Sequence, residues 1–488
     1  MQHKLFIDGK FVDAVEGATF ETLDPHDGSV LAEIAEARAQ DVDRATAAAT
    51  SAFPAWSRMA AAERGRLLLR LADAIDDDVE NLALLETRDT GHPIRDTRGL
   101  DVPRTAATFR YFGGMADKFQ GSVIPVEQGF LDYVLPEPLG VVGQIVPWNF
   151  PVMFTSWKLG PALAAGNCVV MKPSEISPLS ALRVAELAAA VGFPPGVINM
   201  VPGFGASAGA RIVDHPGIAK VSFTGSTAVG KGIARSAAET LKQVHLELGG
   251  KGANIVFDDA DISAAVNGTA FGIFHNQGQA CIAASRLIVH AKVKDEFMER
   301  LVTLTRSIKV GDPKDSATEM GPLTSAMHRD RVLTHLALTQ QDGGKVLAGG
   351  GVPQDRALAA GYYVEPTIVE VDPGARVAQE EVFGPFMTVH TFTTEDEALA
   401  IANDVAYGLG GGLWTSDLSR AHRIARDLRA GMVWVNSYKR VNPGSPFGGV
   451  GVSGYGREMG FEAMREYSSP KAIWINVDAQ LPAYYPRG

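Results

Sequence analysis

The sequence predicts an α/β protein built from two parallel-sheet domains and a small additional β element. Short apolar runs alternate with helical stretches over residues 139–249, and the same alternation continues after Lys251. Strands that alternate with helices form βαβ units, whose sheets are parallel and buried on both faces. A chain of 488 residues also exceeds the size of one ordinary hydrophobic core.

The N-terminal part predicts a hairpin followed by helices. Apolar and polar residues alternate on both sides of Asp8-Gly9, which is a turn pair and not the apolar core of a signal peptide. Helical spacing of apolar residues follows in AQDVDRATAAATSAFPAW and in ERGRLLLRLADAIDDDVENLALLETRDTG. Gly91 closes the second stretch, a position where glycine commonly ends a helix.

Predicted strands and helices alternate through the rest of the chain and form two α/β regions. The β-rich runs are VVGQIVPW, GNCVVMKPS, GVINMVPG, IAKVSFTG and GANIVFDDAD, and later RLIVHAKV and GMVWVNS. Helical stretches such as LSALRVAELAAAVG, VGKGIARSAAETL and DEFMERLVTLTRSI lie between them. We expect the first domain to comprise residues 1–120 and 139–249, and the second to comprise residues 250–450.

Two segments fit neither domain. Residues 121–138 contain the two-strand pattern GSVIPVEQGFLDYVLPEP, and residues 466–488 contain the strand YSSPKAIWINV. Exposed strands usually need a partner, so we expect these segments to pair with each other. A stronger hypothesis is that they join strands between subunits and produce a homodimer or homotetramer.

Composition excludes several classes of function. The net charge of −11 argues against broad nucleic-acid binding, which usually needs a basic face. No apolar run approaches the ~18 residues of a membrane span. Two cysteines cannot form a disulfide framework, which favours the cytoplasm. The 11 histidines show no zinc-ligand spacing, so no metal is expected.

Two glycine-rich turns compete as phosphate-binding sites. GFGASAG fits the dinucleotide pattern G-x-G-x-x-G/A through Gly203, Gly205 and Ala208, but the next strand ends without the expected acidic residue. A plain tight turn is the favoured interpretation there. FTGSTAVGK joins a predicted strand to a predicted helix between Gly225 and Gly230, where N–H groups and hydroxyls suit a phosphate.

Polar residues at strand ends supply candidates for chemistry. Lys172 and Glu175 follow a buried strand, and Glu175 suits the two ribose hydroxyls of adenosine while repelling a 2′-phosphate. From this stretch alone, a solvated charge pair in a loop is an equally good interpretation. Glu247 precedes a Gly-Gly turn, where burial raises a carboxyl pKa toward that of a general base. Asn149 stands between two prolines as a rigid amide donor for an oxyanion.

The two cysteines differ in their surroundings. Cys168 lies inside an apolar strand, as a small buried residue does. Cys281 lies among small residues that leave backbone N–H groups free. At a helix start, the helix dipole would lower its pKa and favour the nucleophilic thiolate. From this local pattern alone, a buried filler and a nucleophile are equally good interpretations of Cys281.

Seven motifs follow one another along the chain in the order that is typical of a known protein family. They are PWNFP, MKPSE, FTGSTAVG, LELGGK, NQGQAC, EEVFGPF and PFGGVGVSGYGREMG. Together they resemble the NAD(P)-dependent aldehyde dehydrogenase superfamily, and the resemblance covers essentially the whole chain. It implies two Rossmann-like domains, one for the cofactor and one catalytic, with a small β oligomerisation element. It also implies a non-acylating, NAD-dependent enzyme, with NADP as the less favoured cofactor.

The resemblance implies a role for each matching residue. It makes Cys281 the nucleophile, Glu247 the general base that activates water, and Asn149 an oxyanion donor beside the Cys281 amide. The thiolate would attack a small-molecule aldehyde, and loss of hydride would leave a thioester for hydrolysis. The cofactor-binding residues that it implies are Trp148, Lys172, Ser174, Glu175, Gly225, Ser226, Gly230, Glu381 and Phe383.

The resemblance also implies a substrate pocket. Its residues are Phe150, Phe154, Trp157, Ala280, Ile282 and Phe447, for which ordinary core packing is the alternative. As a group they predict an apolar or aromatic aldehyde. Lys439 and Arg440 are able to meet an anionic tail, although a solvated loop is the favoured interpretation. Gly451 departs from the related sequences, which often carry a basic residue there.

Two other functions fit these residues less well. A CoA-acylating relative would resolve the thioester with a thiol, but the presence of Glu247 favours hydrolysis. A non-enzymatic structural member is disfavoured because Cys281, Glu247 and Asn149 are all intact.

Overall fold

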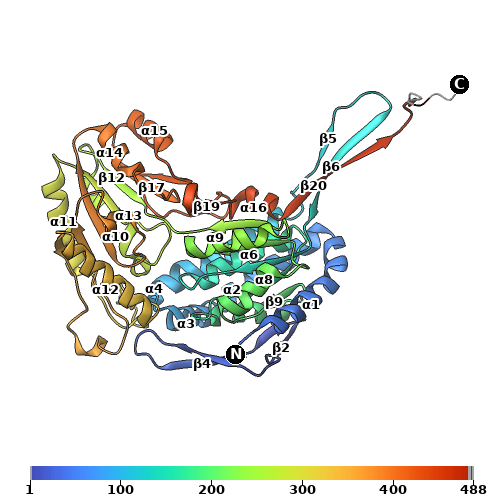
Figure 1. Cartoon of the computed structure of the whole chain (residues 1–488), viewed down its shortest axis with the longest axis horizontal. Helices are drawn as coiled ribbons and strands as arrows, with labels where there is room; N and C mark the ends of the chain where they lie inside the picture. The colour runs from blue at the N-terminus through green and yellow to red at the C-terminus, as the bar shows by residue number, and fades with distance from the viewer. Residues whose placement is uncertain (1–2, 482–484, 486–488) are drawn as a thin grey trace.

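The predicted α/β fold is confirmed: two mainly parallel sheets form two units that lie side by side (Figure 1). The structure, a computed structural model, describes residues 3–481 and residue 485. The strands of the first sheet, in order from edge to edge, are β19 (Gly454–Tyr455), β11 (Gln243–Glu247), β10 (Lys220–Thr224), β7 (Val141–Ile145), β8 (Cys168–Lys172), β9 (Ile198–Met200), β1 (Leu5–Ile7) and β2 (Lys10–Val12).

Helices cover this sheet on both faces. Strands β7, β8 and β9 follow one another in one direction, and β10 and β11 are added on the other side of β7. Right-handed crossovers therefore place α6 and α7 on one face and α8 and α9 on the other. The helices of this unit are α1 (Ala39–Arg58), α2 (Ala61–Asp77), α3 (Val79–Thr90), α4 (Ile94–Asp96), the π-helix η1 (Thr97–Asp101), α5 (Val102–Met115), α6 (Pro151–Ala164), α7 (Leu179–Ala190), the π-helix η2 (Gly205–Gly209), α8 (Ala210–Asp214) and α9 (Thr227–Ala238).

The second sheet has the same construction. Its strands, in order, are β14 (Lys345–Ala348), β15 (Thr367–Glu370), β16 (Phe386–Phe392), β13 (Arg286–His290), β12 (Ala253–Val256), β17 (Gly410–Trp414) and β18 (Met432–Val435), with only β14 antiparallel. Its helices are α10 (Ile262–Phe274), η3 (His275–Gly278), α11 (Lys294–Ser307), α12 (Ala326–Gln341), η4 (Arg356–Leu358), α13 (Arg376–Gln379), α14 (Glu395–Asn403) and α15 (Leu418–Asp427). After this sheet come η5 (Gly451–Ser453) and α16 (Gly460–Glu466).

The N-terminal predictions are confirmed in most respects. Strands β1 and β2 form the hairpin, with Asp8 and Gly9 both at positive φ, and Gly91 ends α3 in the left-handed conformation. The second predicted helical stretch is two helices, because Asp78 leaves helical geometry at φ −99° and ψ 14°. A second hairpin, β3 (Thr19–Leu23) with β4 (Val30–Ala35), was not predicted.

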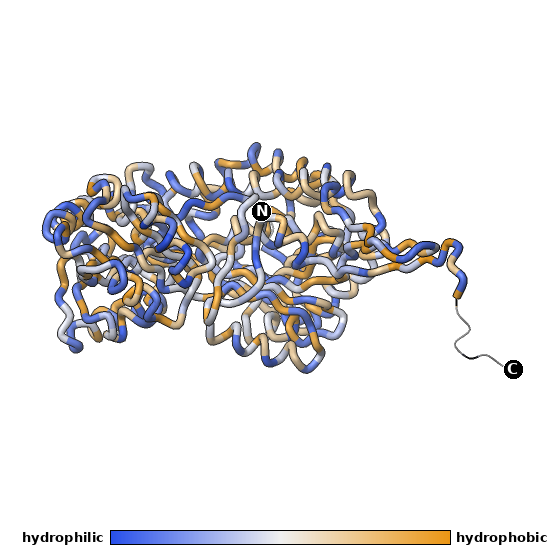
Figure 2. The backbone as a smooth tube through the Cα atoms, turned by 90° about the horizontal axis from the view of Figure 1, so that it is seen from above, coloured by the Kyte–Doolittle hydropathy of each residue, from blue (hydrophilic) through white to orange (hydrophobic). Residues whose placement is uncertain are grey.

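The two leftover segments form an arm. Strand β20 (Ser468–Asn476) pairs along its whole length with β6 (Phe130–Pro138), which also pairs with β5 (Ser122–Ile124). The prediction that the two segments pair with each other within one chain is therefore confirmed. Figures 1 and 2 show the arm projecting from the body on the side away from the second sheet. Among the described residues, no helix has both the length and the apolarity needed to cross a membrane.

Candidate active site

The site begins where the order of strands reverses in the first sheet. Strands β7 and β10 are neighbours, but the chain continues from them toward opposite edges. Such a switch point separates the loops at the carboxyl ends of the strands and leaves a crevice for ligands. A cavity of about 970 Å³ lies there, with Trp148 and Asn149 after β7 and Gly225 and Ser226 after β10.

The turn after β10 is built to receive an anion. Ser226 is the N-cap of α9, and its Oγ accepts a hydrogen bond from the N–H of Val229 at 3.4 Å. The N–H of Gly225 donates to the carbonyl of Glu247 at 3.0 Å, which ties the turn to β11. The free N–H groups and dipole of a helix N-terminus favour a phosphate. The strand–turn–helix context predicted for FTGSTAVGK is therefore confirmed.

The residues after β8 form a second group of polar side chains near the crevice. The buried Lys172 Nζ donates to Glu175 Oε2 at 3.0 Å and to the carbonyl of Gly203 at 2.9 Å. Burial lowers the pKa of Lys172, while Glu175 opposes that shift. Glu175 lines a neighbouring cavity and remains one-third exposed, so its second oxygen is free for a ligand.

Two predicted cofactor residues do not face the cavities. Ser174 Oγ accepts the N–H of Ile176 at 3.2 Å and shapes the turn that carries Glu175. Gly230 lies buried in α9, where a Cβ would come within 2.5 Å of Leu248 Cδ2. This glycine allows the helix to approach the loop after β11.

Loops that enter the second sheet close the other side of the cavity. Cys281 precedes β13, and Glu381 and Phe383 precede β16; all three line the same cavity as Trp148. Trp148 contacts Phe383 edge to face at 5.4 Å between ring centroids. Glu381 accepts the N–H of Gly250 at 2.8 Å, and burial raises its pKa to about 7.

Cys281 lies where two cavities meet. It contributes to the 970 Å³ cavity and also to a second cavity of about 660 Å³. No helix starts at this cysteine: it lies in a turn that follows η3, so the condition for a helix dipole to lower its pKa is not met. Burial raises the pKa of the Cys281 thiol, and the carboxylates of Glu247 and Glu381 add to that effect. Cys168 is fully buried in β8, as predicted.

Asn149 is fixed beside the loop of Cys281 by backbone groups. Its Nδ2 donates to the carbonyl of Gln279 at 2.9 Å, and Asn276 Nδ2 donates to the carbonyl of Asn149 at 2.7 Å. A primary amide carries two N–H donors, so one donor of Asn149 remains for a ligand oxygen in the cavity. The geometry thus holds an amide donor and the sulfur on the same wall.

Glu247 lies at the end of β11 and belongs to a buried polar network. Its Oε1 contacts His245 Nε2 at 3.2 Å, and its Oε2 is buried without a partner among the described residues. Burial raises the pKa of Glu247 well above its usual value, and Glu458 adds to that shift. Burial lowers the pKa of His245 well below its usual value, so its ring is neutral.

This network reaches Glu458. His245 Nδ1 lies 3.3 Å from Ser222 Oγ, which accepts from Lys158 Nζ at 2.8 Å, and Lys158 pairs with Glu458. Lys158 and Glu458 are almost fully buried, so the network joins Glu247 to a second carboxylate through groups that can pass protons. Sequence reasoning missed it because its members are spread over four distant segments.

All six predicted pocket residues line the 660 Å³ cavity with Cys281. These are Phe150, Phe154, Trp157, Ala280, Ile282 and Phe447. Their aromatic rings also contact one another, with Trp157 and Phe447 at 4.8 Å and Phe154 and Trp157 at 5.2 Å between centroids. They therefore serve both as core and as cavity wall.

The same cavity has polar members that sequence reasoning missed or placed wrongly. Lys439 is only 5% exposed and lines the cavity, so its assignment to a solvated loop is wrong. Arg440, its neighbour, is exposed as expected. Arg104 and His275 also line the cavity and were not predicted. His275 could have been predicted as a cavity residue because it directly precedes the motif NQGQAC. Arg104 lies far from every motif of the site in the sequence, so no local signal identifies it.

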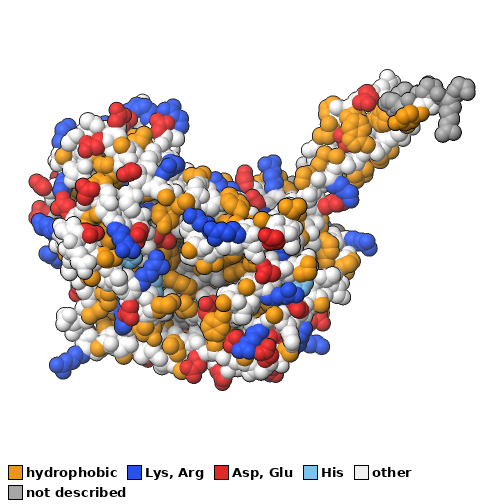
Figure 3. Space-filling model, in the orientation of Figure 1, with side chains coloured by type: hydrophobic (Ala, Val, Ile, Leu, Met, Phe, Trp, Pro, Cys, Tyr) orange, Lys and Arg blue, Asp and Glu red, His pale blue; other side chains and the backbone are white. Residues whose placement is uncertain are grey.

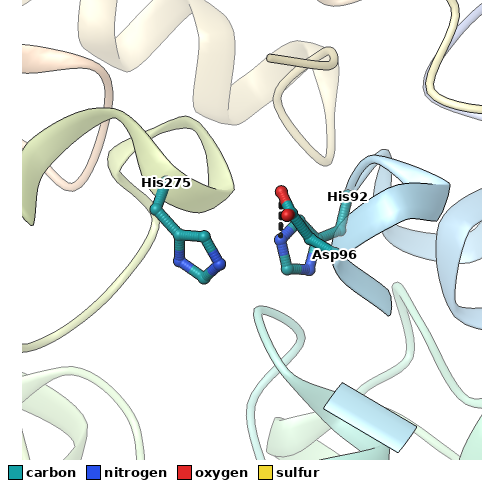
Figure 4. A group of neighbouring side chains, drawn as sticks. All are labelled: His92, Asp96 and His275. Atoms are coloured by element: carbon teal, nitrogen blue, oxygen red, sulfur yellow. Dashed lines mark ion pairs between the residues drawn. The ribbon is translucent and has the colours of Figure 1, made fainter. Parts of the chain in front are cut away.

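His92, Asp96 and His275 form a cluster of neighbouring side chains (Figure 4), and His275 also lines the cavity. His92 Nδ1 lies 2.7 Å from Asp101, and His92 Nε2 lies 3.7 Å from Asp96. Burial lowers the pKa of His92, but Asp101 and Asp96 outweigh it and raise the pKa overall. One ligand atom from each of His92, Asp96 and His275 lies within 4.8 Å of the others. The expectation that no metal is required stays a prediction.

The disfavoured loop GFGASAG is not a plain tight turn. Its residues Gly205–Gly209 form η2, which leads into α8. A mostly apolar cavity of about 910 Å³ lies between this segment and α9, lined by Phe223, Val229 and Ile233 among others. Its lining includes Phe223 and Val229, on either side of the Gly225–Ser226 turn, and its mostly apolar surface suits a flat base.

Comparison with known proteins agrees with this geometry. The model of the aldehyde dehydrogenase family matches residues 11–473. The chain is 46% identical over 480 residues to the mitochondrial aldehyde dehydrogenase of Rattus norvegicus, covering 97% of this chain and 92% of that protein.

Solved structures agree as well. The crystal structures of PnpE from Pseudomonas sp. WBC-3, one in complex with nicotinamide adenine dinucleotide, are 63% identical over the whole of both chains, with a TM-score of 0.99. The NAD+ complex of aldehyde dehydrogenase from Bacillus cereus is 44% identical, with a TM-score of 0.96 over 98% of this chain and 97% of that one. The resemblance seen in the sequence is confirmed, and the chain belongs to the aldehyde dehydrogenase family.

Proposed function

We propose that the chain oxidises an aldehyde to its carboxylic acid with NAD and without coenzyme A. The observation that carries this proposal is the position of Cys281. Its sulfur lies where the cavity with the helix α9 N-terminus meets the cavity with aromatic walls. One cavity suits a dinucleotide, the other suits an aldehyde with an apolar or aromatic body, and the nucleophile has access to both.

The residues present fit NAD. The α9 N-terminus with Gly225 and Ser226 would hold the pyrophosphate, and Trp148, Glu381 and Phe383 would border the nicotinamide riboside. Gly230 and Ser174 would support this site indirectly. The apolar cavity between η2 and α9 would receive the adenine ring.

Glu175 and Lys172 set the preference for NAD. Glu175 would accept both ribose hydroxyls, with Lys172 holding its other oxygen. A carboxylate at that place repels the 2′-phosphate of NADP, which is therefore the less favoured cofactor.

The chain's own groups account for the chemistry. The Cys281 thiolate forms a bond to the aldehyde carbon, and the oxygen that becomes negative receives N–H donors from Asn149 and from the Cys281 backbone. When bound, NAD supplies the hydride acceptor, so that the carbon is left as a thioester on Cys281. Glu247 takes a proton from water, the new C–O bond forms, and the C–S bond breaks to release the carboxylic acid and the Cys281 thiolate.

The network beyond Glu247 would carry the proton away. Its members His245, Ser222, Lys158 and Glu458 are in hydrogen-bonding sequence from the general base. Because Glu247 is present and has a path along which its proton can leave, hydrolysis of the thioester is favoured over transfer of the acyl group to coenzyme A.

The two α/β units would carry different parts of the function. We assign cofactor binding to residues 1–120 and 139–249, and the nucleophile to residues 250–450. Residues 121–138 and 466–488 would form the oligomerisation element of a homodimer or homotetramer. Exposed apolar residues over the arm support this, including Val123, Leu131, Leu135, Trp474 and Ile475 (Figure 3). Neither edge strand of the arm, β5 or β20, has an outer partner among the described residues.

A free, catalytic thiol also favours a reducing compartment, so we infer a cytoplasmic enzyme. The decisive experiment measures formation of NADH by the purified protein with benzaldehyde or hexanal and without coenzyme A. Activity that disappears in Cys281→Ala and persists in Cys168→Ala supports the proposal. Equal activity in Cys281→Ala, or an absolute need for coenzyme A, would refute it.

A further inference from the structure

We propose that the preferred aldehyde carries a carboxylate, which Lys439 and Arg104 bind inside the 660 Å³ cavity. The inference rests on the proposed function, because it narrows the class of aldehyde that Cys281 attacks. It goes beyond the apolar or aromatic body that the cavity walls suit.

Lys439 is a buried cation that lacks a carboxylate partner. It follows β18, lines the cavity with Cys281, and is 5% exposed. Its Nζ has one polar contact among the described residues, the carbonyl of His275 at 3.4 Å, and no acidic group lies within 4.0 Å. Burying an ammonium group without an anion is costly, so such a position is typical of a residue that awaits a charged ligand.

The backbone fixes Lys439 in this place. Its φ is +53°, a left-handed conformation that non-glycine residues rarely adopt. The strained conformation turns the side chain into the cavity, whereas the adjacent Arg440 remains exposed. A solvated surface lysine would gain nothing from this arrangement.

Arg104 supplies a second cation from another element. It lies in the first turn of α5 and lines the same cavity. Its guanidinium makes no ion pair and no hydrogen bond with any described residue, in contrast to most of the other arginines. A guanidinium presents paired N–H donors that match both oxygens of a carboxylate.

The cavity has no acidic residue to neutralise these cations. None of its lining residues is Asp or Glu. Behind His275, the carboxylates of Asp96 and Asp101 are already engaged, because His92 contacts both and Arg95 contacts Asp96 at 3.6 Å. His275, which lines the cavity, is neutral because burial lowers its pKa well below the usual value. Apart from the Cys281 thiolate, the charged side chains that line this cavity are therefore the cations Lys439 and Arg104.

The walls define the rest of the substrate. Phe150, Phe154, Trp157 and Phe447 surround the space between the cations and Cys281 with aromatic rings. Flat aromatic walls suit a planar or unsaturated carbon chain. The structure thus fits an aldehyde whose planar body ends in a carboxylate.

The test compares two aldehydes of the same shape and different charge. 4-Formylbenzoate and 4-formylbenzamide share the ring and the aldehyde, and their para groups differ in charge. We expect kcat/KM of the wild-type enzyme to be at least about tenfold higher for 4-formylbenzoate, the range for one charge-assisted hydrogen bond. Equal values for the two aldehydes would overturn the inference.

Variants then assign the preference to residues. In Lys439→Gln and in Arg104→Gln, kcat/KM for 4-formylbenzoate should fall about tenfold or more, while that for 4-formylbenzamide stays within about threefold. Arg440→Gln is the matched control and should change neither value. An equal fall for both aldehydes in Lys439→Gln would mean that Lys439 acts on Cys281 instead, and would also overturn the inference.

A measurement on the unmodified enzyme avoids any folding defect of the variants. Terephthalate monoamide should inhibit benzaldehyde oxidation competitively and at least about tenfold more strongly than terephthalamide. Equal inhibition by the two would contradict a cationic subsite. If benzaldehyde itself is not oxidised, the proposed function fails; if it is oxidised without any preference for carboxylates, only this inference fails.

Discussion

The side-chain amide of Asn149 is hydrogen-bonded to the carbonyl oxygen of Gln279 at 2.9 Å, two residues before Cys281. The amide that would receive the oxyanion and the loop that carries the sulfur are thus held together by a direct contact between the two α/β units. In the proposed mechanism, the substrate oxygen and the sulfur would therefore be positioned by one shared contact.

Asn149→Ala should therefore lower kcat about 100-fold to 1,000-fold, the loss expected for one oxyanion donor. The sulfur itself remains in place, so the rate of Cys281 alkylation by iodoacetamide should change by no more than about threefold. Steady-state kinetics and mass spectrometry check the two values. If the rate of Cys281 alkylation fell as much as kcat, the variant would have displaced the loop that carries Cys281.

Glu247→Gln should separate the two halves of the reaction. Thioester formation does not need the base, so the variant should produce a rapid burst of NADH, followed by turnover reduced about 100-fold or more. Stopped-flow measurement of NADH checks this, and added hydroxylamine should restore turnover by attacking the thioester. Loss of the burst itself would mean that Glu247 acts earlier.

Glu175→Gln should shift the cofactor preference toward NADP. The change removes a negative charge at the ribose and frees Lys172 Nζ, now 3.0 Å from Glu175, to meet a 2′-phosphate. The ratio of kcat/KM for NADP to that for NAD should rise about tenfold or more. An unchanged ratio would refute the role of Glu175; Glu186→Gln, on the outer face of α7, is a suitable control.

The preference for a carboxylate should weaken as the pH rises. Burial lowers the pKa of Lys439 to about 7, so the free enzyme loses this charge above neutral pH, while a thiolate at Cys281 opposes the shift. Arg104 stays charged and His275 stays neutral over this range. The kcat/KM ratio of 4-formylbenzoate to 4-formylbenzamide should therefore fall between about pH 7 and pH 9. Titration of Cys281 or Glu247 cancels in the ratio, and a constant ratio would contradict the prediction.

The arm should determine the assembly state. Trp474 is 54% exposed on β20, and Trp474→Asp would place a charge on an apolar contact surface. Analytical ultracentrifugation should show a smaller assembly than the wild type, whereas Lys471→Gln, which removes a surface ion pair with Glu137 on the same arm, should not. A wild-type protein that sediments as a single protomer would remove the oligomerisation role altogether.

Local patterns predicted most of the architecture because strands, helices and turns carry short-range signals. The turn at Asp8-Gly9, the helix end at Gly91 and the strand–turn–helix at Gly225 were all correct. The break at Asp78 was missed because the spacing of apolar residues continues across it. The packing role of Gly230 depends on Leu248, which belongs to a different element.

The site was predicted unevenly for a similar reason. Asn149 and Cys281 were singled out because a recognisable motif surrounds each of them, and both line one cavity. Lys439 was assigned to solvent because a lysine beside an arginine ordinarily is exposed, and its burial in the cavity wall depends on a left-handed backbone conformation that the sequence does not reveal. Arg104 and His245 carry no local signal, since their importance comes from contacts with distant segments.

The turn before Cys281 links distant positions to its sulfur. Asn276, Gln277 and Gly278 are left-handed in succession, and Gln277 Nε2 is anchored to the carbonyls of Gly91 at 3.1 Å and Pro322 at 2.8 Å. A Cβ on Gly278 would lie 2.0 Å from the carbonyl of Gly384. Tolerance to mutation in this enzyme will therefore be lowest at scattered backbone anchors as well as at the sulfur. Efforts to broaden its substrate range should vary Ala280 and Ile282 and leave these anchors untouched.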